Sequence, residues 1–244
     1  MGLIAVMLAT SDRLVEAAFF VFLGIIFDFF DGFAARLLKV QSNLGVQLDS
    51  LADMVTSGVV PGVVMFQLLN RSLALQTGGY SWDVSDWIKI ESADTGFMHW
   101  EVIRFNLIPF LGLLLTLAAA YRLAKFNLDS RQKEHFIGLP TPAMALFILS
   151  LPLILTFHTG SEFILNTYFL AAVTLFLSIL MNINLPLFSL KFKKFNFADN
   201  WLQITFMAIS ILLIIFLKLV ALPVIILLYI VLSIVYNFLS PKKV

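Results

Sequence analysis

The sequence predicts an all-α fold: a polytopic membrane helix bundle with about seven full spans plus a short N-terminal helix. Of its 244 residues, 60% are hydrophobic and 13% are charged. Soluble domains are apolar for just under half of their residues and charged for about a quarter. The mean hydropathy is +0.96, and apolar runs of the ~20 residues that cross a hydrocarbon core as a helix recur along the chain.

The elements follow from these runs in order. Residues 1–10 are apolar but too short to span, and we expect them to be the end of a helix that begins upstream. The later runs predict helices at 14–38, 45–69, 104–126, 139–157, 163–187, 201–218 and 221–239.

The charged residues exclude some functions and indicate an orientation. A net charge of +1 argues against a nucleic-acid partner, and the absence of cysteine excludes a thiolate metal site. If the helices alternate in direction, most cations fall on one side: Arg36, Lys39, Arg122, Lys125, Arg131, Lys133, Lys191, Lys193, Lys194, Lys242 and Lys243. The positive-inside rule places that side in the cytosol, which predicts an integral membrane protein with its basic loops facing the cytosol.

Four aspartates interrupt two of the predicted helices and form two acidic stripes. The first stripe has the helical spacing i, i+3, i+4 and i+7: Asp28, Asp31, Gly32 and Ala35. The second stripe lies on the next helix: Gly45, Asp49, Ala52, Asp53 and Thr56. Because the turn between the two helices is short, we expect them to be antiparallel neighbours whose acidic stripes face each other.

Converging carboxylates repel one another unless they share protons or surround cations. A carboxylate costs about 3 kcal/mol at the centre of a membrane helix, so four of them need a compensating partner. Hard divalent ions such as Mg²⁺ or Mn²⁺ prefer oxygen ligands and retain positions for substrate phosphates. The small residues of each stripe leave room for close helix approach and for a ligand against the backbone.

The same residues resemble the signature of the CDP-alcohol phosphatidyltransferase family, D-x2-D-G-x2-A-R-x8-G-x3-D-x3-D. All eight fixed positions are present at the family's spacing: Asp28, Asp31, Gly32, Ala35, Arg36, Gly45, Asp49 and Asp53. The resemblance implies that Asp28, Asp31, Asp49 and Asp53 bind divalent metal, as two ions. It also implies that Asp53 is the catalytic base, and that the CDP group is bound by Asp28, Asp31, Gly32, Ala35, Arg36 and Gly45.

Flanking stretches resemble the integral-membrane phosphatidylserine synthases of bacteria. These stretches are LGVQLDSLADMVTSGVVPG, YRLAKFN at 121–127 and FIGLPTPA at 136–143. The resemblance implies transfer of a phosphatidyl group from CDP-diacylglycerol to L-serine, with release of CMP. It also implies a homodimer in the bacterial cytoplasmic (inner) membrane, with the active site facing the cytosol. It assigns residues 1–150 to the catalytic helices and 151–244 to further membrane helices of the same domain.

The acceptor can also be considered from the residues. Arg122, with Lys125 and Asn127, is expected to bind serine or a lipid phosphate, although positive-inside cations would give the same pattern. Glycerol 3-phosphate or an inositol phosphate is an alternative acceptor, but its second phosphate would favour a richer arginine cluster. An ion or proton transporter is a third interpretation, but it would need polar groups through the whole bilayer depth, whereas these aspartates gather toward one face.

Overall fold

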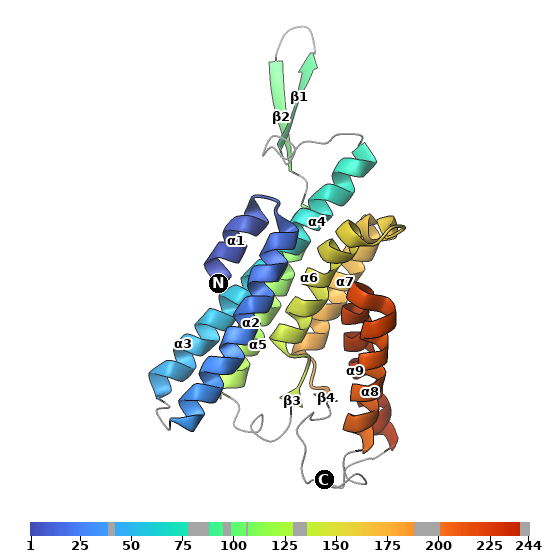
Figure 1. Cartoon of the computed structure of the whole chain (residues 1–244). Helices are drawn as coiled ribbons and strands as arrows, with labels where there is room; N and C mark the ends of the chain where they lie inside the picture. The colour runs from blue at the N-terminus through green and yellow to red at the C-terminus, as the bar shows by residue number, and fades with distance from the viewer. Residues whose placement is uncertain are drawn as a thin grey trace.

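The computed structural model describes residues 1–38, 42–77, 88–94, 99–105, 107–128, 136–187 and 201–239. Within these ranges helices form the body of the molecule and run alongside one another in a bundle (Figure 1). This confirms the predicted helical membrane protein in its general form. Several cations that predicted the orientation lie outside the described residues: Lys39, Arg131, Lys133, Lys191, Lys193, Lys194, Lys242 and Lys243.

The helices fall into two sets along the chain. The first set is α1 Gly2–Thr10, α2 Leu14–Leu37, α3 Asn43–Asp53, the π-helical segment η1 Met54–Val59 and α4 Val60–Thr77. The second set is the 3-10 turn η3 Pro109–Gly112, α5 Leu113–Leu128, α6 Thr141–Phe157, η5 Glu162–Leu165, α7 Thr167–Asn182, α8 Trp201–Leu217, η6 Lys218–Val220 and α9 Ala221–Leu239. Two antiparallel strand pairs complete the described elements: β1 Ile88–Asp94 with β2 His99–Phe105, and β3 Phe136–Ile137 with β4 Pro186–Leu187.

Most predicted helices are confirmed, but three were wrong at their ends. The helix predicted for 45–69 continues to Thr77, the end of α4. The helix predicted from residue 104 begins only after η3, because residues 104–105 belong to β2. The helix predicted for 163–187 is shorter, because Asn166 caps α7 by accepting hydrogen bonds from two backbone amides of its first turn. At its other end α7 stops at Asn182, before β4.

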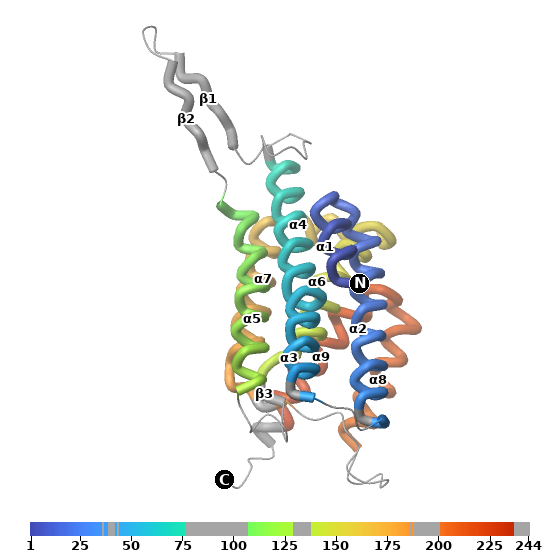
Figure 2. Tube along the Cα trace, turned by 90° about the vertical axis from the view of Figure 1, so that its left-hand side faces the viewer, coloured from blue at the N-terminus to red at the C-terminus, as the bar shows by residue number. Residues whose placement is uncertain are grey.

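The core of the bundle lies between α4, α5, α6 and α7 (Figure 2). Its fully buried side chains are almost all aliphatic: Met65, Leu68, Leu69, Leu115, Met144, Ile148, Leu149, Leu153, Leu170, Leu177 and Met181. Interdigitation of these side chains fixes the relative positions of the helices that carry the polar residues described below.

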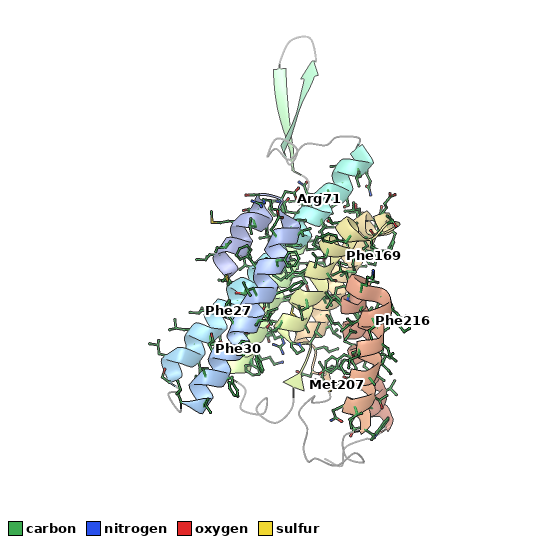
Figure 3. The ribbon with its side chains drawn as sticks, viewed as in Figure 1. Phe27, Phe30, Arg71, Phe169, Met207 and Phe216 are labelled. Carbon is green, nitrogen blue, oxygen red and sulfur yellow. The ribbon has the colours of Figure 1, made fainter. Side chains whose placement is uncertain are left out.

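Of the two N-terminal helices, α1 packs against α2 and α4, and α2 packs mainly against α1 and α6. Both helices carry fully buried alanines: Ala5, Ala9, Ala17 and Ala18. Small residues allow two helix backbones to approach closely. At the same end of the bundle the Arg71 guanidinium donates to the Asp12 carboxylate at 2.7 Å. Figure 3 shows Arg71 of α4 at this end of the bundle, whereas Phe27 and Phe30 lie further along α2, away from it.

Three helical stretches of the described residues are long and apolar enough to cross a membrane: Leu44–Gln76, Pro109–Leu128 and Trp201–Tyr236. The third stretch contains α8 and α9, which fold back on each other at η6. Most of its apolar side chains face away from the bundle. Phe216 is 78% exposed and Met207 is 48% exposed. Figure 3 shows Phe216 at the outer edge of the molecule. Lipid is the natural environment for such a surface.

The π-helical segment η1 lies directly after the second acidic stripe. Pro61 follows this segment and has no backbone N–H to donate within the helix. The Thr116 hydroxyl of α5 donates to the Gly58 carbonyl of η1 at 3.1 Å, so part of the hydrogen bonding comes from a neighbouring helix. A Cβ atom on Gly62 would lie 2.1 Å from the Thr116 hydroxyl. Glycine at this position therefore permits the close contact between α4 and α5.

Candidate active site

The two acidic stripes meet, as the sequence predicted. Carboxylate oxygens of Asp28 and Asp31 on α2 and of Asp49 on α3 lie within 4.8 Å of one another. Asp28 is half-buried, whereas Asp31 and Asp49 are exposed. Asp28 and Asp49 are also within hydrogen-bonding reach of each other. We call these three residues the carboxylate cluster.

The start of α3 is fixed by a local cap. The Ser42 hydroxyl accepts a hydrogen bond from the Gly45 backbone amide at 3.0 Å, which satisfies one of the free amides of the first turn. Asp49 then follows one turn after Gly45 on the same face of α3. The cap therefore sets the register that brings Asp49 to α2.

Asp53 lies one turn beyond Asp49 and faces a cavity of about 480 Å³. This volume is within the range of small-molecule sites, roughly 300 to 1,000 Å³. Asp28 and Asp31 line the same cavity, and apolar or small residues complete its wall: Met1, Gly2, Leu3, Gly24, Ile25, Phe27, Leu51, Ala52, Val55 and Thr56. Half-buried Asp53 therefore shares one space with two members of the carboxylate cluster.

Of the residues predicted to bind CDP, Gly32 has the most informative surroundings. A Cβ atom built on Gly32 would meet nothing within 4 Å, so open space lies against this part of α2. Ala35 is half-buried one turn further along, and Gly45 is exposed on α3. The Arg36 side chain lies outside the described residues.

Arg122 is a buried cation whose charge acts on Asp53. Its side chain belongs to α5 and is only 7% exposed. Its Nε atom has no hydrogen-bond partner among the described residues. Burial of an arginine donor without a partner is costly, which makes this atom a candidate for binding an anionic group of a substrate.

The other two predicted acceptor residues are tied to neighbouring elements. Lys125 donates through Nζ to the Asn184 side-chain oxygen at 3.0 Å. Asn127 donates to the Ser50 hydroxyl at 3.1 Å, next to Asp49 on α3. These bonds hold α5 beside α3 and beside the chain that follows α7.

Sequence reasoning did not identify the polar residues that α7 brings against α5, where Asn182 donates to the Ala118 carbonyl one turn before Arg122. Ser178 and Asn182 each carry a buried polar atom that has no hydrogen-bond partner among the described residues. The signal was present in the sequence as polar residues within an apolar helix, SILMN at 178–182. Only the packing of α7 on α5 gives that signal a location.

Comparison with known proteins identifies a family whose match covers the residues of this site. Residues 1–183 match the CDP-alcohol phosphatidyltransferase family. The chain is 34% identical over 155 residues to the CDP-diacylglycerol–serine O-phosphatidyltransferase of Bacillus subtilis, across 61% of this chain and 68% of that protein. The enzyme of the same name from Helicobacter pylori is 26% identical over 211 residues, across 86% of this chain and 76% of that protein. The enzyme of the same name from Methanocaldococcus jannaschii is 28% identical over 148 residues, across 61% of this chain and 52% of that protein.

Proposed function

Because the chain belongs to the CDP-alcohol phosphatidyltransferase family, we propose that it transfers the phosphatidyl group of CDP-diacylglycerol to L-serine, giving phosphatidylserine and CMP. The names of the similar proteins support serine as the acceptor. The observation that carries the proposal is the meeting of the carboxylate cluster with a cavity of about 480 Å³, which Asp53 also lines.

The carboxylate cluster fits a divalent cation, because its donor atoms are all hard oxygens. We assign Asp28, Asp31 and Asp49 as ligands of two Mg²⁺ or Mn²⁺ ions, with Asp53 beside them. Bound there, such ions would neutralise the negative charge of the CDP pyrophosphate and of the departing CMP.

Asp53 acts as the base in this proposal. The serine hydroxyl oxygen bonds to the phosphorus that carries the diacylglycerol, and the bond between that phosphorus and the CMP oxygen breaks. The hydroxyl proton passes to the Asp53 carboxylate, and CMP leaves. The half-buried position of Asp53, on the cavity wall with Asp28 and Asp31, supports this role.

The nucleotide lies against the first acidic stripe. Open space at Gly32 allows the CDP group to approach the backbone of α2, and Ala35 continues the same face. Arg36 in the last turn of α2 and Gly45 in the first turn of α3 complete the proposed nucleotide site, for which the charge of an arginine suits the phosphates.

Arg122 binds the carboxylate of the acceptor. A buried guanidinium with a free donor, placed beside the proposed base, suits a small anionic group. Lys125 and Asn127, in the last turns of α5, hold this helix in place through their hydrogen bonds to Asn184 and Ser50, and they add positive charge and polarity at the same end of α5.

The membrane arrangement is proposed on the same basis. Helices α6 and α7 are shorter apolar helices packed within the bundle, and we count them with α2, α4, α5, α8 and α9 as seven spans. The carboxylate cluster then faces the cytosol from the inner membrane of a bacterium, since Lys and Arg gather on that side. The exposed apolar surface of α8 leaves room for a homodimer within the bilayer.

An acceptor screen tests this function. Purified protein would receive CDP-diacylglycerol and one labelled acceptor in each reaction: L-serine, glycerol 3-phosphate or an inositol phosphate. We expect lipid product only from serine, and no product from the Asp53→Asn variant. Product from a phosphorylated alcohol alone would refute the proposed acceptor. Absence of CMP release with every acceptor would leave the transporter interpretation in its place.

A further inference from the structure

A group of buried polar atoms without partners lies where α5 and α7 meet. Among the described residues, four buried side-chain atoms lack a hydrogen-bond partner: Ser57 Oγ, Arg122 Nε, Ser178 Oγ and Asn182 Oδ1. Three of these four belong to the contact between α5 and α7. They comprise one charged donor and two neutral oxygens, a combination that points to a ligand with both anionic and donor groups.

Hydrogen bonds from Asn182 place these atoms near one another. Its Nδ2 atom donates to the Ala118 carbonyl of α5 at 3.2 Å and to the Ser178 carbonyl of α7 at 3.1 Å. Ala118 lies one turn before Arg122, on the same face of α5. A long helical side chain covers the turn that precedes its own Cα, so the Arg122 side chain extends over the turn that Asn182 contacts.

The hydroxyl of Ser178 departs from the usual behaviour of serine and threonine in this bundle. Such hydroxyls normally donate to the carbonyl four residues earlier in their helix. Thr174, one turn before Ser178, donates to Leu170 at 2.8 Å, and Ser233 donates to Tyr229 at 2.7 Å. Ser178 makes no such bond among the described residues. Its hydroxyl is therefore available to a ligand on the face that it shares with Asn182.

We propose that Arg122, Ser178 and Asn182 form a pocket for the zwitterionic head of an α-amino acid, in which Asn182 Oδ1 and Ser178 Oγ accept hydrogen bonds from the ammonium group. This proposal rests on the proposed function and extends it to the specificity for serine. Arg122 binds the carboxylate, as proposed above. Two neutral oxygens suit an ammonium whose positive charge is already balanced by its own carboxylate.

The order of residues across the bundle agrees with this pocket. The charge of Asp53 acts on Arg122, and α7 packs against α5, the helix that carries Arg122. Serine held by its carboxylate at Arg122 and by its ammonium at α7 directs its hydroxyl toward Asp53. An acceptor such as glycerol 3-phosphate has no ammonium and would leave both α7 oxygens unpaired, so the pocket selects against it.

The sharpest variant is Ser178→Ala, because it removes a hydroxyl that makes no bond within the described structure. A purely structural role predicts no loss of stability or activity. The matched control is Ser150→Ala on α6, since the Ser150 hydroxyl is also buried but donates to the Phe147 carbonyl of its own helix. Asn182→Leu is the stronger variant and removes both its oxygen and its bond to Ala118.

Two measurements test the pocket: the KM values for L-serine and CDP-diacylglycerol, and the rise in melting temperature that L-serine causes without added metal. We expect Ser178→Ala to raise the KM for serine by roughly threefold and Asn182→Leu by roughly tenfold or more, with the KM for CDP-diacylglycerol unchanged. Stabilisation by serine should fall in both variants. Inhibition by 3-hydroxypropanoate, which lacks the ammonium group, should be unchanged in Ser178→Ala.

An unchanged KM for serine in both folded variants overturns the pocket, as does an equal loss of binding for 3-hydroxypropanoate in Ser178→Ala. A water molecule that bridges these atoms would give the first of these results. If wild-type protein transfers nothing to serine, the proposed function fails. In that case stabilisation by serine alone decides the pocket, and its absence overturns it.

Discussion

Replacement of one aspartate in the carboxylate cluster should stabilise the metal-free protein and abolish its stabilisation by metal. Asp31→Asn is the cleanest change, because Asp31 is exposed and the substitution preserves its shape. It removes two repulsions, with Asp28 and with Asp49, whose oxygens lie within 4.8 Å. At about 5 Å two like charges repel by about 1 kcal/mol in water and by about 3 kcal/mol at the effective dielectric near a protein surface.

Solvent screening favours the lower value for exposed groups, so we expect a gain of about 2 kcal/mol from the two lost repulsions. For a chain of this size that corresponds to a rise of roughly 5 °C in melting temperature. The assay is thermal unfolding in detergent at about pH 8, first in EDTA and then with Mn²⁺ or Mg²⁺. In saturating metal the wild type should become the more stable of the two proteins. Metal at about 100 times its Kd stabilises the wild type by about 2.7 kcal/mol, and it should not stabilise Asp31→Asn.

The control is Glu162→Gln, which removes an exposed carboxylate outside the cluster and should change neither melting temperature nor metal response. Lower stability of Asp31→Asn in EDTA would refute the repulsion argument. Undiminished stabilisation of Asp31→Asn by metal would refute the assignment of Asp31 as a ligand.

Three further substitutions separate packing from function. Gly112→Ala places a Cβ atom 2.5 Å from the Phe66 backbone nitrogen, so it should destabilise the protein by about 2 kcal/mol or more, measured as a lower melting temperature. Gly32→Ala meets nothing within 4 Å, so its melting temperature should equal that of wild type while its KM for CDP-diacylglycerol rises; a wild-type KM would count against CDP binding there. Arg71→Met removes the 2.7 Å ion pair with Asp12 and should lower stability by about 1 to 2 kcal/mol without changing either KM value.

The acidic stripes were predictable because helical periodicity converts sequence spacing directly into a shared face. Asp28 and Asp31 could be placed on one face of α2, and a short turn then required α3 to return beside it. The cavity wall was not predictable in the same way. Its members Met1 and Gly2 come from α1, whose packing against η1 depends on the close contact between Gly2 and Thr56.

Two other features show what local patterns leave undecided. β1 begins with four residues that alternate between apolar and polar, IKIE at 88–91, which is a short strand signal that the charged residues around it obscured. Ser178 and Asn182 gave only a weak signal of function, since polar residues near the end of an apolar helix are ordinary. The contact of Asn182 with Ala118, one turn before Arg122, depends on how α7 packs against α5, some 60 residues away in the sequence, and sequence periodicity does not report such packing.

The proposed function depends most directly on cation-dependent transfer at the carboxylate cluster. The decisive measurement is the simultaneous release of CMP and formation of labelled phosphatidylserine by purified protein given CDP-diacylglycerol and labelled L-serine. We predict equal amounts of both products with Mn²⁺ or Mg²⁺, and neither product in EDTA or from Asp53→Asn. Equal product formation with and without divalent cation, or full activity of Asp53→Asn, would contradict the account.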